Sequence, residues 1–159
     1  MSEATFALLK PEAIAQGLVG EIIRRLEAAG PRLAALHLRT VPRELAERHY
    51  GQEIADKYGA DVRQWLLDYL ISGPVVAMVL VGENAARVVR RTSGEAADPP
   101  ECGPGTIRHD LCDDTRAAAM AEGRALRNLI HTSDSPESAR REIALWFGDD
   151  FAASLTPSG

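Results

Sequence analysis

The run from Val75 to Val81 is the longest uninterrupted apolar stretch of the chain, and it constrains the fold more than any other feature. A strand that is apolar at every position must be covered on both faces, as the central strands of layered domains are. The same run is far too short for a transmembrane helix, which needs about 20 apolar residues. It therefore predicts the central strand of a sheet in a protein without a membrane span.

Patterns on either side of this run alternate between strand and helix. Helices are predicted where apolar residues recur every three or four positions, and loops where Gly and Pro cluster. The predicted strands are 5–9, 32–41, 75–81 and 128–130, and the predicted helices are 18–26, 42–70 with breaks near Gly51 and Gly59, 84–91, 114–126 and one that follows a Ser135 cap. Residues 93–110 are dense in Gly, Pro, Asp and Glu and are predicted to be mostly loop.

This order of elements predicts a single domain over residues 1–159, of the α+β class. The expected architecture is a ferredoxin-like βαββαβ sandwich with a helical hairpin inserted after the second strand and a long loop before the last strand. A length of 159 residues suits one domain with a substantial apolar core.

The charge balance excludes some partners and leaves others open. A formal net charge of -5 argues against a broad nucleic-acid-binding surface, so no nucleic acid is expected as a partner. Of the 18 basic residues only Lys10 and Lys57 are lysines, and the others are arginines. Arginine forks suit phosphate and carboxylate, although a genome-wide preference for arginine codons is the preferred explanation of the total.

Cellular location is predicted from the cysteines and from the first residues. Cys102 and Cys112 are too few for a disulfide framework and fit a reducing compartment. The first five residues lack the basic and apolar regions of a signal peptide. We therefore expect a cytoplasmic protein with no membrane association.

His131 is the most distinctive candidate for chemistry. It ends a short apolar segment and is followed by Thr132, Ser133 and Asp134, which places an imidazole at a sheet edge beside hydroxyls and a carboxylate. Such a histidine can be a base, a metal ligand or a nucleophile, but taken alone it is better explained as a structural residue. The chain contains neither a phosphate-binding loop of the Gly-x-x-x-x-Gly-Lys-Ser/Thr type nor a Gly-x-Gly-x-x-Gly turn.

Arginines supply a second signal. Arg90 ends a predicted helix, Arg108 follows the loop, and Asn128 precedes the histidine segment. Phosphoryl transfer depends mostly on positioning and charge neutralisation, so cations and amide donors around one nucleophile would suit it. Arg87 and Arg91 are better explained as a solvated helix end.

Five motifs in order resemble those of the nucleoside diphosphate kinase family. They are Thr5-Phe6-Ala7-Leu8-Leu9-Lys10-Pro11-Glu12-Ala13 with Gly17-Leu18-Val19-Gly20-Glu21-Ile22-Ile23, then Ser72-Gly73-Pro74-Val75-Val76-Ala77-Met78, Pro104-Gly105-Thr106-Ile107-Arg108, Arg127-Asn128-Leu129-Ile130-His131-Thr132-Ser133-Asp134-Ser135, and Glu142-Ile143-Ala144-Leu145-Trp146-Phe147. Each motif is weak alone, but together they are specific and cover residues 5–147.

The resemblance implies a ping-pong enzyme that passes the terminal phosphate of ATP or another nucleoside triphosphate, through a phosphohistidine, to a nucleoside diphosphate. His131 would be the nucleophile, and Glu142 would hold its other ring nitrogen with Ser133 near that contact. The remaining carried-over residues would bind phosphates and sugar or lie near the histidine: Lys10, Arg90, Arg108, Asn128 and Tyr50. The resemblance also implies Mg²⁺ carried by the nucleotide with no metal cage on the protein, and a homo-oligomer that is a hexamer, tetramer or dimer.

Three departures from the family pattern bear on these expectations. Ala96 stands where the family has a phosphate-contacting Thr, which predicts weaker but not abolished activity. The hairpin before Ser72 is longer than usual, so the base contact falls on Val62 by counting, with Tyr58 the nearest aromatic residue. About ten residues around 111–121 are inserted in a loop that contacts other subunits in the family.

Other interpretations remain at this point. A catalytically silent nucleotide-binding or interaction module could share the fold, but it would be expected to lose His131, Lys10 or Arg108 first. A small acyl- or phosphate-binding ferredoxin-like domain would not need the ordered motifs. Cys102, His109 and Cys112 could form a metal cluster, but three ligands are a weak pattern and two free thiols are preferred.

Overall fold

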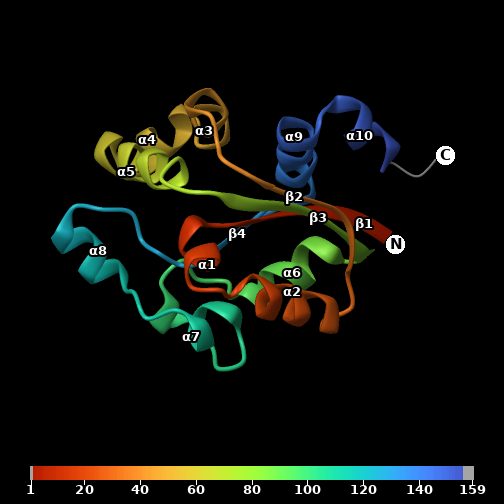
Figure 1. Ribbon diagram of the computed structural model, residues 1–159, viewed down its shortest axis with the longest axis horizontal. Helices are drawn as coiled ribbons and strands as arrows, with labels where there is room; N and C mark the ends of the chain where they lie inside the picture. The colour runs from red at the N-terminus through yellow and green to blue at the C-terminus, as the bar shows by residue number, and fades with distance from the viewer. Residues whose placement is uncertain (1, 156–159) are drawn as a thin grey trace.

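A four-stranded antiparallel sheet forms the centre of the computed structural model, which describes residues 2–155 (Figure 1). The strand order is β2-β3-β1-β4, with antiparallel pairing throughout. The strands are β1 (Ser2–Leu9), β2 (Arg32–Arg39), β3 (Val75–Glu83) and β4 (Ile130–Thr132). The predicted α+β class and ferredoxin-like architecture are thus confirmed.

Helices cover both faces of this sheet. They are α1 (Pro11–Ala15), α2 (Val19–Ala28), α3 (Arg43–His49), α4 (Gln52–Tyr58), α5 (Ala60–Leu70), α6 (Ala85–Ser93), α7 (Ile107–Leu111), α8 (Arg116–Glu122), α9 (Pro136–Phe147) and α10 (Asp149–Ser154), with a 3-10 turn η1 (Pro99–Glu101). Figure 1 shows α3, α4, α5, α9 and α10 on one side of the sheet and α2, α6 and α7 on the other. Within residues 2–155, no helix is both long enough and apolar enough to cross a membrane.

The apolar run of β3 divides its side chains between two cores. Val75, Ala77 and Val79 belong to the core beneath α9, and Val76 and Met78 belong to the core beneath α2. Side chains alternate across a strand, so a strand covered by helices on both faces needs apolar residues at every position. Burial of each large apolar side chain contributes about 1.5–3 kcal/mol. The prediction of a strand buried on both faces is confirmed.

Several predicted boundaries are wrong for identifiable local reasons. The proline at position 11 stops β1 as expected, but it also occupies the first turn of a short helix, α1, which the sequence analysis did not predict. The helix predicted over 114–126 ends at Glu122, because Gly123 adopts a left-handed conformation with φ of 64°. The predicted loop 93–110 contains η1 and the start of α7.

Differences also occur near the chain's last strand and at the sheet edge. The last strand spans Ile130–Thr132, whereas 128–130 was predicted. His131 therefore lies within the strand and not after its end. Strand β2 ends at Arg39 and not at residue 41, and Leu36 and Leu38 on it are 49% and 58% exposed. Helix α10 was not predicted. The Ser135 cap is confirmed, because its side chain accepts a hydrogen bond from the Ser138 N–H.

Candidate active site

A cavity of about 750 Å³ opens beside the sheet edge formed by β4. Helices α3, α4, α6, α7 and α9 contribute its walls together with β4. The basic side chains that line it are Arg48, Lys57, Arg90, Arg108 and Arg141, and the acidic ones are Glu53, Glu95, Asp134 and Glu142. Clustered cations in an otherwise acidic protein suit an anionic ligand such as a phosphate chain.

His131 lies on β4 opposite Leu8 of β1, and its ring is held by a buried carboxylate. The ring Nε2 lies 2.7 Å and 3.1 Å from the two carboxylate oxygens of Glu142 on α9, which is 2% exposed. A carboxylate accepts hydrogen bonds, so Nε2 carries the proton and the lone pair of the neutral ring is on Nδ1. Ser133 Oγ, 3.4 Å away, donates to the same carboxylate. The ring is therefore prepared to act as a nucleophile through Nδ1.

His49 on α3 forms a wall against the ring of His131. Its Nδ1 accepts a hydrogen bond of 3.1 Å from the indole N–H of Trp146, and its ring meets the His131 ring edge-on at 4.7 Å between centroids. Burial is the main cause that lowers the pKa of His49 well below its usual value, and the charges of Arg141 and Lys10 act in the same direction. His49 is thus a neutral residue that limits the movement of the His131 ring.

Tyr50 follows His49 at the end of α3 and lines the same cavity. Its ring centroid lies 6.4 Å from that of His131. Burial, together with the charge of Glu142, raises the pKa of Tyr50, so its phenol stays protonated and can donate a hydrogen bond.

Arg108 on α7 is a buried cation whose hydrogen bonds hold the cavity walls together. Its Nη1 donates 2.9 Å hydrogen bonds to the carbonyls of Gly94 and Ala96, its Nη2 donates to the carbonyl of Ile130, and its Nε donates at 3.4 Å to that of Asn128. A guanidinium has five N–H donors, so one Nη2–H has no partner among residues 2–155. That donor leaves Arg108 able to bind a ligand oxygen while its other donors fix the walls.

Lys10 lies at the end of β1, behind the cavity wall, and is only 6% exposed. Its ammonium donates a 2.6 Å hydrogen bond to the side-chain oxygen of Asn128, whose amide nitrogen donates in turn to the Ala97 carbonyl at 2.8 Å. Burial is the main cause that lowers the pKa of Lys10 to about 8, with the charge of Arg108 acting in the same direction and that of Glu12 opposing it.

The pKa of Lys10 predicts a pH dependence for the phosphate contact that the resemblance implies. Lys10 is a cation below about pH 8 and becomes neutral above it, so a phosphate held by Lys10 would lose one cationic partner as the pH rises. We expect the dissociation constant of ADP to be nearly constant below this pH and to rise by up to about tenfold per pH unit above it. Titration calorimetry between pH 6.5 and 9.5 measures this change. Lys10→Arg keeps the cation, so its profile should be flat, and a rise of the same size in that variant would contradict the assignment.

The remaining predicted residues occupy different places. Ser133 is buried behind His131. The carbonyl of Ala96 accepts a hydrogen bond from Arg108, but Ala96 does not line the cavity. Val62 on α5 also lies outside the lining, whereas Tyr58 on α4 is part of it. The base contact of Val62 therefore stays a prediction.

Two residues of the site region were missed by the sequence analysis. His49 stands directly before Tyr50, which was expected near His131, and that adjacency was the available signal. Glu12 follows the Lys10-Pro11 pair and accepts a hydrogen bond from the Leu129 N–H. Nothing in its local pattern distinguished it from a surface acid in the first turn of a helix.

The structure also shows where the potential metal ligands lie. Cys102 and Cys112 are free thiols, as preferred, and Cys102 Sγ lies 3.2 Å from the carbonyl of Ala96. Within the described part of the chain, the side chains spaced to hold a metal ion are His49, His131 and Glu142. Two imidazoles and one carboxylate are not the oxygen-rich set that Mg²⁺ prefers, and the Nδ1 of His49 is already occupied by Trp146. The residues thus offer no protein cage for Mg²⁺ at this place.

Comparison with known proteins gives a consistent family. The family model described as nucleoside diphosphate kinase matches residues 3–151. The chain is 45% identical over 148 residues to a nucleoside diphosphate kinase of Archaeoglobus fulgidus, covering 93% of this chain and 88% of that protein. It is 44% identical over 147 residues to that of Symbiobacterium thermophilum, covering 92% and 88% of the two chains.

Solved structures agree with this result. A nucleoside diphosphate kinase from Borrelia burgdorferi, described as a transition-state mimic with bound vanadate and ADP, superposes with a TM-score of 0.90 at 29% identity, over 99% of this chain and 92% of that one. An NDP kinase from Pyrobaculum aerophilum has a TM-score of 0.85 at 35% identity, over 94% and 98%. The motif order, the histidine held by a buried glutamate and these matches lead to one conclusion: the chain belongs to the nucleoside diphosphate kinase family.

Proposed function

We propose that this phosphotransferase moves the terminal phosphate of a nucleoside triphosphate to a nucleoside diphosphate by way of a phosphorylated His131. The observation that carries the proposal is the bond between His131 Nε2 and buried Glu142, which leaves the Nδ1 lone pair free. In the first step Nδ1 forms a bond to the γ-phosphorus, the bond from phosphorus to the bridging oxygen breaks, and its electron pair leaves with the diphosphate. The second step reverses this on a different nucleoside diphosphate.

Cations around the cavity would stabilise the charge that develops on the phosphoryl oxygens. Arg90 and Arg108 line the cavity from α6 and α7. Lys10 lies behind the lining and donates to Asn128, whose amide donates to the carbonyl of Ala97 in the lining. Preorganised donors at fixed positions are the main source of rate acceleration in phosphoryl transfer. Mg²⁺ bound to the nucleotide phosphates would neutralise further charge, because this ion is usually held through substrate phosphates.

Substrate scope is proposed to be broad with respect to the base. ATP and other nucleoside triphosphates would act as donors, and the contact to the base would come from Val62, as counted along the chain, or from Tyr58 in the lining. The relative from Borrelia burgdorferi holds ADP and vanadate, which supports a nucleotide as the ligand of this chain.

Steady-state kinetics test the two-step reaction. With ATP as donor and GDP, CDP or UDP as acceptor, double-reciprocal plots at several acceptor concentrations should give parallel lines, because the first product leaves before the acceptor binds. Intersecting lines would indicate direct transfer in a ternary complex. Nucleotide binding without any transfer would instead identify a silent binding module.

We further propose that the protein is a homo-oligomer, a hexamer, tetramer or dimer, in which a second copy covers β2. This strand is at the edge of the sheet, and two of its large apolar side chains, Leu36 and Leu38, are exposed. Exposed edge strands with apolar side chains pair readily with another chain.

The oligomer has a direct test by light scattering after gel filtration. Replacement of Leu36 and Leu38 by Glu together should lower the molar mass, since charge would be buried at the contact. Ala153→Glu on α10, at an exposed position, serves as the matched control and should leave the mass unchanged. A monomeric wild-type protein, or a double variant with unchanged mass, would contradict this contact.

Residues 1–159 are proposed to form one domain, because both cores lie against opposite faces of one sheet. A cytoplasmic location is proposed from the two free thiols, which suit a reducing compartment.

A further inference from the structure

A strained turn precedes the strand that carries His131. Leu129 has a φ of 69°, in the left-handed region that leucine rarely adopts, and the Ile130 N–H donates a 2.8 Å hydrogen bond back to the Asn128 carbonyl. A hydrogen bond between residues two apart around a positive φ defines the rarer, strained form of the γ-turn. Such a conformation persists only where its surroundings impose it. The contacts of this turn therefore decide how Asn128 and His131 are presented.

The side chain of Glu12 accepts a hydrogen bond from a main-chain N–H of this turn. Its Oε1 accepts a 2.6 Å hydrogen bond from the Leu129 N–H, and the Leu129 carbonyl accepts a 2.8 Å hydrogen bond from the Lys10 N–H. The turn is thus attached through both of its main-chain groups to the segment that joins β1 to α1. That segment also carries the Lys10 ammonium, which binds Asn128.

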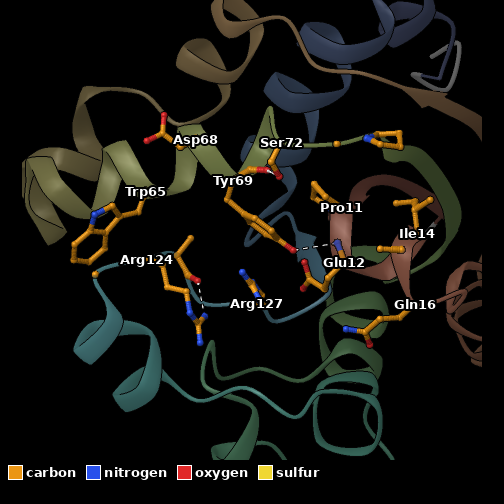
Figure 2. Close-up of a pocket in the computed structure, with 15 residues that line it drawn as sticks. Pro11, Glu12, Ile14, Gln16, Trp65, Asp68, Tyr69, Ser72, Arg124 and Arg127 are labelled. Atoms are coloured by element: carbon orange, nitrogen blue, oxygen red, sulfur yellow. Dashed lines mark hydrogen bonds between the residues drawn. The ribbon is translucent and has the colours of Figure 1, made fainter.

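Glu12 is itself held in place from a third element. Its main-chain N–H donates a 3.1 Å hydrogen bond to the hydroxyl of Tyr69 on α5. Figure 2 shows this contact at one side of a second cavity, of about 760 Å³, that lies between α5 and the segment 123–127. The carboxylate is therefore fixed by the start of α1 as well as by the turn that it contacts.

The burial of this carboxylate is costly and needs an explanation. Glu12 is 8% exposed, and its Oε2 is buried without a hydrogen-bond partner among residues 2–155. Burial raises the pKa of Glu12, and the charge of Lys10 acts against that shift. A buried charge that leaves one oxygen unpaired is unfavourable unless the other oxygen makes a contact that the protein needs.

We propose that Glu12 is a positioning residue of the phosphotransfer site, whose carboxylate holds the Asn128–Leu129 turn so that Asn128 meets Lys10 and β4 presents His131. Glu12 touches neither the nucleotide nor the reacting atoms in this account. It acts through the Leu129 N–H and, as a counter-charge, through Lys10. The inference rests on the proposed function of His131 and adds a residue outside the cavity lining.

Two variants of equal length separate the hydrogen bond from the charge. Glu12→Gln removes the charge but keeps an oxygen for the Leu129 N–H, whereas Glu12→Met removes both. Both variants lack the charge, so any difference in rate between them reports the loss of the hydrogen-bond acceptor for the Leu129 N–H. At saturating ATP, the single-turnover rate of phosphoenzyme formation should be about tenfold or more lower in Glu12→Met than in Glu12→Gln, given what an unsatisfied buried N–H costs. Glu27→Met, the same substitution at an exposed position of α2, should stay within about threefold of wild type.

Hydrogen exchange of the Leu129 amide gives a readout that does not depend on activity. We expect wild-type protection in Glu12→Gln and faster exchange in Glu12→Met. Equal rates of phosphorylation in the two variants would overturn the inference. If Glu12→Met does not fold, loss of Leu129 protection in Glu12→Gln would overturn it, and retention would support it. A wild-type enzyme that forms no phosphoenzyme would refute the function of His131 instead, while the exchange measurement would still test the turn.

Discussion

His131→Ala should abolish phosphoryl transfer while leaving the fold intact. The change removes the Nδ1 lone pair that forms the bond to phosphorus, and loss of a nucleophile typically lowers kcat by about 10⁴-fold or more. The change also removes a hydrogen-bond donor from the buried Glu142 carboxylate, so the free energy of unfolding should fall by about 1–3 kcal/mol while the fold is retained. A coupled assay of ADP release from ATP with GDP as acceptor measures the transfer rate.

A second histidine, on the other side of the sheet, provides the control for this variant (Figure 1). His109 on α7 has a side chain that is 40% exposed and contacts Asp110. His109→Ala should keep the wild-type rate within about twofold, as most exposed substitutions do. If His131→Ala retained the wild-type rate, the nucleophile would have to be another residue.

Arg108→Ala should reduce both stability and activity. The guanidinium binds the carbonyls of Gly94, Ala96, Asn128 and Ile130, and each buried acceptor left without a partner costs about 1–3 kcal/mol. We expect the free energy of unfolding to fall by about 3 kcal/mol or more on this basis. Loss of one preorganised cation at the phosphoryl group should also lower kcat by about 10²-fold or more.

The comparison of three variants separates these two effects of Arg108. Arg108→Lys keeps the charge but cannot form the planar fork, so it should recover little of the stability. Arg87→Ala, on the exposed face of α6, should be neutral in both urea unfolding and kinetics. Full stability of Arg108→Ala would show that the four carbonyls find other partners and that the structural part of the account is wrong.

The architecture could be predicted from the sequence where burial decides the pattern. The run 75–81 must be buried on both faces whichever helices cover it, and it forms the strand that pairs with both β1 and β2. The short elements α1, α7 and α10 could not be predicted in this way. Each has no more than six residues, so its formation depends on tertiary contacts more than on periodicity.

The candidate site was predictable where a residue belongs to a motif. His131, Glu142, Arg90 and Arg108 line one cavity, whereas Lys10 and Asn128, which belong to the same motifs, lie outside its lining, and the roles of all six stay predictions. The tautomer of His131 and the attachment of the turn by Glu12 depend on distances between residues far apart in the sequence. Those distances exist only in the folded chain, so composition and spacing carry no information about them.

The position of the phosphate in the phosphoenzyme tests the central claim most directly. The purified protein is incubated with ATP alone, digested under alkaline conditions and mapped by mass spectrometry, and a parallel sample is treated with GDP. The account predicts one phosphoryl group on His131, stable to alkali, labile to acid and removed by GDP. A phosphate on any other residue, or one on His131 that GDP cannot remove, would contradict it.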